Sequence, residues 1–394
     1  MPHLLETYAL NCGAKIDKPY IYDSYISVAA DKYITLQPFS RFEGKRYDFW
    51  DEVIDYIHPA LSERGIKVVQ LGMAEDMPIE KCVHMQGKTT VNQAAYVVKN
   101  SIMHVGTDSF LCHIASGFDK KIVSLYSTNY SAVCRPYWSR SEDLFLLEPD
   151  RNKYKPAFAQ VDNPKQINFI KPEEVAEAVF KALGIDEKIK YKSIYTGQHY
   201  HFFNLQSIPS SPARINQEIP LSVRMDIEFN EGNLAKQLQL TVCNVITNKP
   251  INIDLLKSAA ANKRINEIVY YLDENHSPEF AEEINSLGVT AALMTKMEDD
   301  ELEKIKLDYL DYGFINQEKR LEEDVAKIKS QSLDKLYFRT KKKIFKDGSI
   351  YNSIASLKNN VPLAKMTDTA PIKIFDCDEF WDDLQHFNIL EKLD

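Results

Sequence analysis

The segment VGTDSFLCHIASGFDKKIVSLYSTN (residues 105–129) decides the fold of the N-terminal part of this chain. Its pattern is the end of an apolar strand, a turn at residues 106–109, a helix, and a second apolar strand that ends in Ser127 and Thr128. A strand, a helix and another strand in this order are typical of a parallel β-sheet. Because ligands of such sheets bind beyond the carboxyl ends of the strands, the small and acidic residues in this segment mark a candidate binding edge.

The same alternation of strands and helices extends over residues 31–185. Apolar strands are predicted at 32–40, 66–72, 81–87, 102–106, 121–127 and 144–149, with helices at 47–65, 91–101 and 171–184. Continuously apolar strands indicate a sheet that is covered on both faces. We therefore predict an α/β fold with a Rossmann-type, doubly wound parallel sheet in this part of the chain.

The remainder of the chain predicts a second domain. With 394 residues the chain exceeds the roughly 250–300 residues at which single cores stop growing. Residues 186–220 lose periodicity and contain Pro209 and Pro212, so they are predicted to connect the domains. Residues 221–394 are predicted as a second α/β domain, in which 221–229 and 238–246 flank an Asn-Glu-Gly-Asn turn signal and should pair as a hairpin.

Charge and cysteine usage exclude several classes of function. The net charge of −9 disfavours a nucleic-acid partner, since phosphate neutralisation needs clustered cations. The basic run Arg339–Lys343 with Lys346 is predicted to be a solvated strand or loop with a local anion contact at most. Six cysteines without a Cys-x-x-Cys motif disfavour a disulfide framework, and no metal site is predicted.

Targeting signals also bear on the expected location. No apolar run reaches the roughly 18 residues of a membrane span, so none is predicted. The first residues, MPHLLETYALNCG, lack the basic region and cleavage site of a signal peptide. A cytoplasmic protein is therefore expected.

The loops that follow the predicted N-terminal strands contain small residues, acids and cations that suit a ribose, a sugar and a diphosphate. Arg41 and Lys45 follow the first strand, and the N–H groups of residues 108–110 open a helix whose dipole favours an anion. Simpler explanations remain open: Lys45 as a solvated loop residue, Asp108 as an ordinary N-cap and His113 as a structural histidine. Neither G-x-G-x-x-G nor a P-loop motif is present, which disfavours a nicotinamide dehydrogenase or an ATPase.

Longer stretches of this region resemble a known family. The segments YITLQPFSRFEGKRYDFWDEVIDYI, GIKVVQLGMAED and GKTTVNQAAYVVKNSIMHVGTDSFLCHIASGFDKKIVSLYSTN are similar to the nucleotide-sugar-binding half of glycosyltransferase family 9, the ADP-heptose:lipopolysaccharide heptosyltransferases of GT-B fold. The resemblance covers roughly residues 31–185. It implies a GT-B-like arrangement in which this domain binds the sugar donor.

The resemblance also implies roles for individual residues. Lys45 matches the family lysine that contacts the donor phosphates, and Asp108, Ser109 and His113 match the Asp-[ST]-Gly-x-x-His segment that meets the donor sugar and diphosphate. Glu75 or Asp76 corresponds to the acid that contacts the ribose. The complete predicted donor site is Ser40, Arg41, Lys45, Glu75, Asp76, Thr107, Asp108, Ser109, His113, Ser127 and Thr128. Phe110 replaces the family's glycine, and Tyr126-Ser127-Thr128 replaces its Gly-Pro-Thr, which leaves the donor's identity open.

The order of domains departs from the family. Residues 1–30 resemble the linker that precedes the donor half, whereas the family's acceptor domain, which carries the catalytic base, does not precede them. Either the domain after residue 220 serves as a permuted or newly acquired acceptor domain, or another chain supplies one. Weak candidates for the base, all near predicted strand ends, are Asp226, Glu228, Asp273 and Glu274.

The resemblance thus predicts a metal-independent glycosyltransferase that uses a nucleoside diphosphate sugar and needs no further cofactor. Its expected acceptor is a hydroxyl of a glycan, of lipopolysaccharide type or lipid-linked. The alternatives are a sugar-nucleotide epimerase, a glycosyltransferase that modifies a nucleic-acid base, and a noncatalytic nucleotide-sugar-binding protein. The sequence leaves the oligomeric state open.

Overall fold

The computed structural model describes residues 2–151, 153–210, 220–318 and 321–393. The chain divides into two compact units, Met1–Lys192 with Leu393–Asp394, and Ser193–Lys392. The boundary lies within strand β7 (Tyr191–Thr196). The predicted connecting segment 186–220 therefore contains β7 and also β8 (Asn204–Ser207).

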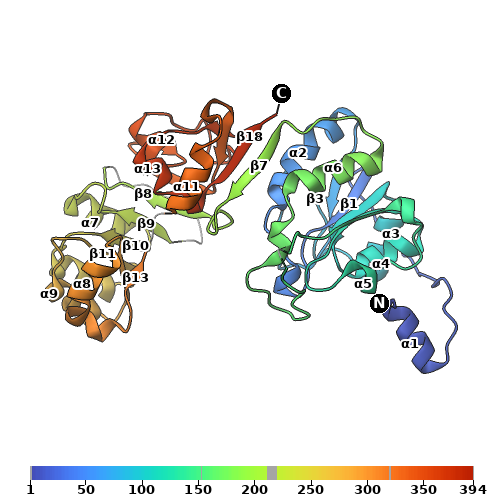
Figure 1. Ribbon diagram of the computed structural model, residues 1–394, viewed down its shortest axis with the longest axis horizontal. Helices are drawn as coiled ribbons and strands as arrows, with labels where there is room; N and C mark the ends of the chain where they lie inside the picture. The colour runs from blue at the N-terminus through green and yellow to red at the C-terminus, as the bar shows by residue number, and fades with distance from the viewer. Residues whose placement is uncertain (1, 152, 211–219, 319–320, 394) are drawn as a thin grey trace. The chain divides into compact units, whose positions relative to one another are not determined.

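The N-terminal unit contains a parallel sheet of six strands in the order β3-β2-β1-β4-β5-β6 (Figure 1). Its strands are β1 (Tyr33–Gln37), β2 (Lys67–Gln70), β3 (Val83–His84), β4 (Met103–Thr107), β5 (Lys121–Leu125) and β6 (Leu144–Leu147). Helices α2 (Trp50–Glu63) and α6 (Pro172–Leu183) pack together, and α3 (Val91–Asn100) packs with α4 (Phe110–Gly117). The two pairs cover opposite faces of the sheet, which confirms the predicted doubly wound fold.

Helix ends in this unit follow from local sequence. Thr90 accepts a hydrogen bond from the Gln93 N–H, and the Gln93 side chain accepts one from the Thr90 N–H, which completes a capping box before α3. Gly184 ends α6 with φ +68°, a conformation that glycine adopts without strain. The short helices α1 (Leu4–Cys12) and α5 (Ser131–Cys134) lie against each other.

The C-terminal unit is built around an eight-stranded sheet in the order β13-β12-β11-β10-β9-β8-β15-β16. Beside β8 its strands are β9 (Leu221–Arg224), β10 (Cys243–Thr247), β11 (Ile265–Leu272), β12 (Thr290–Thr295), β13 (Asn316–Gln317), β15 (Lys342–Lys346) and β16 (Ser349–Tyr351). All neighbours are parallel except β15 and β16. Helices α7 (Glu231–Leu240), α8 (Ile253–Ala261) and α9 (Pro278–Asn285) share one hydrophobic core with β9–β12, which confirms a second α/β domain.

The predicted hairpin between residues 221–229 and 238–246 is wrong. Strands β9 and β10 pair in parallel, with Val223 opposite Val245, and helix α7 connects them. Asn230, which was assigned to a turn, is the N-cap of α7 and accepts a hydrogen bond from the Asn233 N–H. The same residue types favour turns and N-caps, so the local signal did not distinguish the two.

A smaller antiparallel sheet completes this unit, in the order β17-β14-β18-β7. Its other strands are β14 (Leu336–Arg339), β17 (Ile372–Lys373) and β18 (Asn388–Lys392). Phe338, Phe380 and Phe387 pack together in its core, joined by apolar residues of α11 (Glu322–Lys329) and α13 (Asp378–Trp381). The remaining described helices are α10 (Asp299–Ile305) and α12 (Ile354–Lys358).

The basic run Arg339–Lys343 is not solvated as predicted. Lys342 and Lys343 are buried, with 2% and 4% of their surface exposed. The Lys342 Nζ lies 2.9 Å from both carboxylate oxygens of Asp383, and the Lys343 Nζ donates to the Asp368 carbonyl. Two of the four cations in residues 339–343 are therefore part of the interior of the C-terminal unit.

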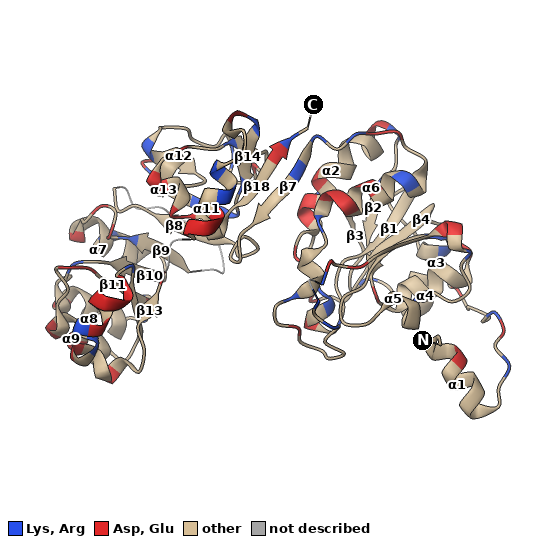
Figure 2. Ribbon diagram, in the orientation of Figure 1, with Lys and Arg blue, Asp and Glu red and all other residues tan. Residues whose placement is uncertain are grey.

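Figure 2 shows Lys and Arg scattered among Asp and Glu in both units. All six cysteines are free thiols. Of the helices in the described ranges, none combines the length and the apolar character that crossing a membrane requires.

Candidate functional site

The strand order of the N-terminal unit creates a topological switch point between β1 and β4. From β1 the chain continues to β2 on one side, whereas from β4 it continues to β5 on the other. The loops that leave the carboxyl ends of these two strands therefore diverge, and such a switch point is the usual ligand site of these sheets. Lys45 lies in the loop after β1, and Asp108 directly follows β4.

The structure brings Lys45 and Asp108 together at this switch point. The Lys45 Nζ lies 2.5 Å from the Asp108 Oδ2, and only 14% and 9% of the two side chains are exposed. The two residues are 63 positions apart in the sequence, so the sheet topology creates the pair. A nearly buried ammonium group at the carboxyl edge of the sheet is suited to bind a phosphate in exchange for its carboxylate partner.

The loop that carries Lys45 is held by backbone contacts. Lys45 ends a 3-10 turn, η1 (Glu43–Lys45), and its N–H donates to the Phe42 carbonyl. The Gly44 N–H donates to the Gln160 carbonyl over 2.8 Å, and the Ser127 Oγ donates to the Gly44 carbonyl over 2.9 Å. Ser127, one of the predicted site residues, thus positions the turn that presents Lys45.

Gly44 allows close packing of this turn, and Gly44→Ala is expected to lower the free energy of unfolding by about 1–3 kcal/mol. An added Cβ would lie 3.0 Å from the Thr128 Cγ2 and 3.1 Å from the Asp162 Cβ. Gly232→Ala in helix α7 is the control, because its Cβ would have an ordinary contact of 3.6 Å with Asn230. Urea unfolding measures both variants, and equal stability of the two would contradict this account of the turn.

His113 lies on α4 within the electrostatic reach of this ion pair. Burial lowers the pKa of His113, the charge of Asp108 opposes that shift, and the charges of His3 and Lys45 add to it. The imidazole is therefore neutral near pH 7 and can donate one hydrogen bond and accept another. The charges of Lys45 and Asp108 both act on His113, so the three side chains lie near one another.

Other predicted residues near the pair have supporting positions. Thr107 ends β4 and is buried, and its Oγ1 has no hydrogen-bond partner within the described part of the chain. Ser109 is the N-cap of α4, but its side chain makes no capping hydrogen bond. Thr128 is buried against Gly44. The Ser40 Oγ accepts from the Phe42 N–H, and its carbonyl accepts from the Arg46 Nε.

Three predicted residues make no hydrogen bond or ion pair with Lys45 or Asp108 within the described part of the chain. Two of them, Arg41 and Glu75, are exposed. The Asp76 Oδ2 accepts a hydrogen bond of 2.7 Å from the Met73 N–H and closes the turn after β2. Its observed contact is therefore one that shapes a loop.

Sequence reasoning missed two side chains at the same edge. The Arg151 guanidinium, which follows β6, binds the Glu148 carboxylate at 2.7 Å and donates to the Ser127 carbonyl at 3.2 Å. The Cys134 Sγ lies 3.8 Å from the Asp108 Oδ2. Arg151 could have been predicted as a site residue, because it is a cation that follows the last predicted strand. Nothing in the sequence indicates that Cys134 lies near Asp108.

The four candidate bases of the C-terminal unit fall into two pairs. Asp226 is bound by Arg224 through two hydrogen bonds of 2.8 and 2.7 Å, and Glu228 is bound by the Lys346 Nζ at 2.9 Å. Asp273 and Glu274 instead line a pocket. Burial acts to lower the pKa of Arg224, but its hydrogen bonds to Asp226 raise it above its ordinary value, so Arg224 stays protonated.

Comparison with known proteins supports the assignment of the N-terminal region. Residues 13–158 match the model of glycosyltransferase family 9 (heptosyltransferase). The predicted family resemblance is confirmed. The region that this family model matches contains the whole switch point, including Lys45, Asp108 and His113. It begins at residue 13, within the segment predicted to resemble a linker.

Individual relatives each match part of the chain. Lipooligosaccharide heptosyltransferase 2 of Haemophilus influenzae is 25% identical over 136 residues, which are 31% of this chain and 39% of that protein. The chain thus spans about two-fifths of the length of this curated relative. A glycosyl transferase family 9 structure from Veillonella parvula is 22% identical with a TM-score of 0.33, covering 39% of this chain and 46% of that one. An ADP-heptose lps heptosyltransferase II structure from E. coli is 18% identical with a TM-score of 0.35, covering 46% and 62%.

Proposed function

We propose that the glycosyltransferase family 9 region binds a nucleoside diphosphate sugar at the switch point, and that the protein transfers this sugar to an acceptor hydroxyl. The Lys45–Asp108 pair between β1 and β4 is the observation that carries the proposal. The matched family is named for heptosyltransferases, so a heptose-like sugar and a glycan or lipopolysaccharide-type acceptor are the first substrates to test.

Different side chains bind the diphosphate and the sugar of the donor. Lys45 and the amino end of α4 supply positive charge for the diphosphate, which becomes the leaving group. The Asp108 carboxylate, released from Lys45, accepts hydrogen bonds from sugar hydroxyls, and the neutral His113 donates one. In the reaction the acceptor oxygen bonds to the anomeric carbon, the bond from that carbon to the diphosphate oxygen breaks, and the acceptor proton leaves to a base.

Lys45→Ala is expected to weaken binding of both a nucleoside diphosphate and its sugar conjugate by about 1–3 kcal/mol, the cost of losing a charged hydrogen-bond donor. Asp108→Ala removes a negative charge beside the phosphates, so binding of the free nucleoside diphosphate should not weaken. Binding of the sugar conjugate should weaken, because the variant lacks the carboxylate that accepts hydrogen bonds from sugar hydroxyls. Calorimetry with ADP, UDP, GDP and CDP and their sugar conjugates measures both variants.

Lys67→Ala is the matched control for these binding measurements. Lys67 is an exposed lysine at the amino end of β2, at the opposite edge of the sheet from the site. Unchanged binding in Lys45→Ala, or an equal loss in Lys67→Ala, would refute the proposed site.

A noncatalytic nucleotide-sugar-binding protein is the second candidate. Phe110, which stands where the family has glycine, is the first residue of α4 and is 46% exposed, so a bulky ring lies at the helix end where the diphosphate would approach. Release of the nucleoside diphosphate separates the two functions. A transferase releases it when acceptor glycan is added, and a binding protein does not.

A further inference from the structure

A pocket lies at the carboxyl edge of the parallel sheet in the C-terminal unit. It has a volume of about 550 Å³ and is lined by residues that follow β11 and β12 together with one face of α10. Leu272 is the last residue of β11, and Lys296 follows the end of β12. The pocket therefore occupies the edge where parallel sheets bind ligands, and its size is in the usual range for small-molecule sites.

Two polar side chains of this pocket are held in place from outside it. The Asp273 Oδ2 accepts a hydrogen bond of 3.0 Å from the Asn248 Nδ2, and its Oδ1 accepts one of 2.8 Å from the Asn275 N–H. The His276 Nδ1 lies 2.6 Å from the Tyr309 hydroxyl. Each carboxylate oxygen keeps a second lone pair, so Asp273 is oriented and can still accept a hydrogen bond from a ligand.

The charges of the pocket restrict the ligand that it can hold. Both signs are present, with carboxylates of Asp273, Glu274 and Glu301 and ammonium groups of Lys296 and Lys304. This excess of acids disfavours a polyphosphate. Within the described residues, no group of three or more His, Cys, Asp or Glu side chains is arranged to hold a metal ion.

The remaining lining is apolar and comes from Leu272, Met297 and Ile305. A sugar ring matches this combination, because its hydroxyl groups both donate to carboxylates and accept from ammonium groups, while its C–H faces contact apolar side chains. Glu274, Glu301 and Lys304 make no side-chain hydrogen bond or ion pair with any other described residue, so they are available to such a ligand.

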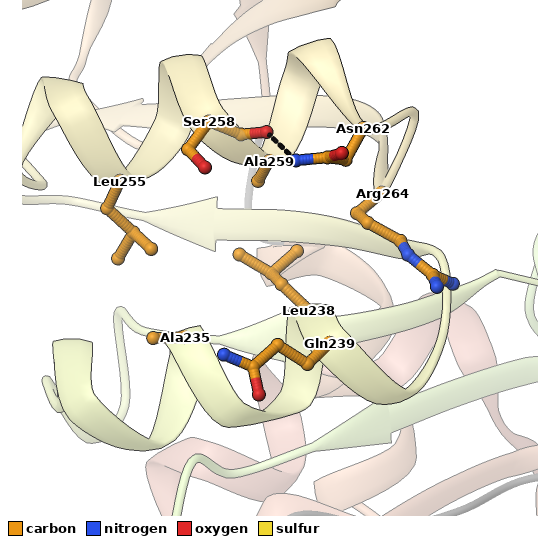
Figure 3. A pocket seen from close by; sticks show the side chains of 8 residues that line it. All are labelled: Ala235, Leu238, Gln239, Leu255, Ser258, Ala259, Asn262 and Arg264. Atoms are coloured by element: carbon orange, nitrogen blue, oxygen red, sulfur yellow. Dashed lines mark hydrogen bonds between the residues drawn. The ribbon is translucent and has the colours of Figure 1, made fainter.

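A second pocket of the same unit has a different character and serves as an internal comparison. It lies between α7 and α8, where Leu238 and Leu255 point into it and Arg264 lies at one end (Figure 3). Its residues belong to the helix-covered face and the amino edge of the sheet. It contains no carboxylate among its lining residues.

We propose that the pocket around Asp273 binds a carbohydrate and is the acceptor-glycan site of this protein. This inference rests on the proposed function, since an acceptor is needed only if a sugar is transferred. It places recognition of the acceptor in the C-terminal unit, on residues separate from the family 9 region.

Saturation-transfer NMR on the full chain tests the proposal with maltose, lactose, chitobiose, mannobiose and inorganic pyrophosphate as probes. At least one disaccharide should bind, and Asp273→Ala should weaken its binding at least tenfold. Glu274→Ala, at an exposed position that cannot disturb folding, should weaken it severalfold. Gln239→Ala, in the comparison pocket, should leave it unchanged.

Three results would overturn the carbohydrate site: no disaccharide binds, the Asp273 and Glu274 variants bind as the wild type does, or pyrophosphate displaces the bound disaccharide. Calorimetry with the nucleotide sugars on the same variants distinguishes failure of the proposed function from failure of the carbohydrate site. Loss of nucleotide-sugar binding in Lys45→Ala with disaccharide binding intact in that variant supports both sites. Disaccharide binding without any nucleotide-sugar binding would refute the proposed function and leave the carbohydrate pocket standing.

Discussion

Asp383→Ala is expected to lower the free energy of unfolding of the C-terminal unit by about 3–5 kcal/mol, the cost of breaking a buried ion pair from one side. Lys342 is only 2% exposed and both oxygens of Asp383 lie 2.9 Å from its Nζ, so the variant leaves an ammonium group buried without its carboxylate. Although burial acts to raise it, the charge of Lys342 holds the pKa of Asp383 below its ordinary value. Hydrogen exchange across a urea series, read on peptides of β15 and β18, measures the effect.

Asp382→Ala provides the matched control for this variant. Asp382 is adjacent in sequence but 40% exposed, and its ion pair with Lys296 spans 3.6 Å, so its loss should cost less than about 1 kcal/mol. The double variant Lys342→Met with Asp383→Leu removes both charges and should recover most of the stability. An Asp383→Ala protein as stable as Asp382→Ala would show that the buried pair is not needed.

The N-terminal unit is expected to lose about 2 kcal/mol of stability between pH 7 and pH 5 through one histidine. His104 lies in β4 and is fully buried, and burial lowers its pKa to about 3. In the unfolded chain the same group has its ordinary pKa near 6.5, so the unfolded state takes up the proton first. This contribution is present above pH 6.5 and is lost as the pH falls from there towards 3. Hydrogen exchange of β1 and β4 peptides, corrected for the intrinsic pH dependence, measures it.

His104→Gln should flatten this pH dependence, because glutamine does not titrate. The Thr35 hydroxyl, 3.0 Å from the His104 Nδ1, can hydrogen-bond to an amide as well. The assignment to His104 fails if the His104→Gln variant retains the wild-type slope.

The fold of the N-terminal unit could be predicted because its signals are local. Apolar strands that end near glycine or serine, and a helix that begins after Thr90, are patterns within ten residues of one another, and the sheet followed from their alternation. The same reasoning places both Lys45 and Asp108 at the carboxyl edge of the sheet, whereas their ion pair is visible only in the structure. Only the family motif indicates His113 as a donor-site residue. Its spacing alone is equally consistent with a structural histidine.

The features that escaped prediction depend on contacts between distant parts of the chain. Lys342 could not be recognised as buried, because its partner Asp383 lies 41 residues away and the intervening sequence has no pattern that links them. Asn230 was assigned to a turn because only the packing of α7 on the second sheet shows that the chain continues as a helix there. Asp273 stands out as an acid near a predicted strand end, but the pocket beside it depends on the packing of α10, which no local pattern around Asp273 indicates.

Four of the six outer strands in the described sheets are very short, which limits self-association at those borders, whereas the outer strands β6 and β7 have four and six residues. Strands β3, β13 and β17 contain two residues each and β16 contains three, whereas the apolar β11, with eight residues, has neighbours on both sides. Such short borders expose few unpaired N–H and C=O groups, so another copy of the chain finds little to extend by strand addition. Lengthening β13 with alternating valine and threonine would expose more unpaired backbone groups at that border. The folded protein would then aggregate by strand addition between molecules.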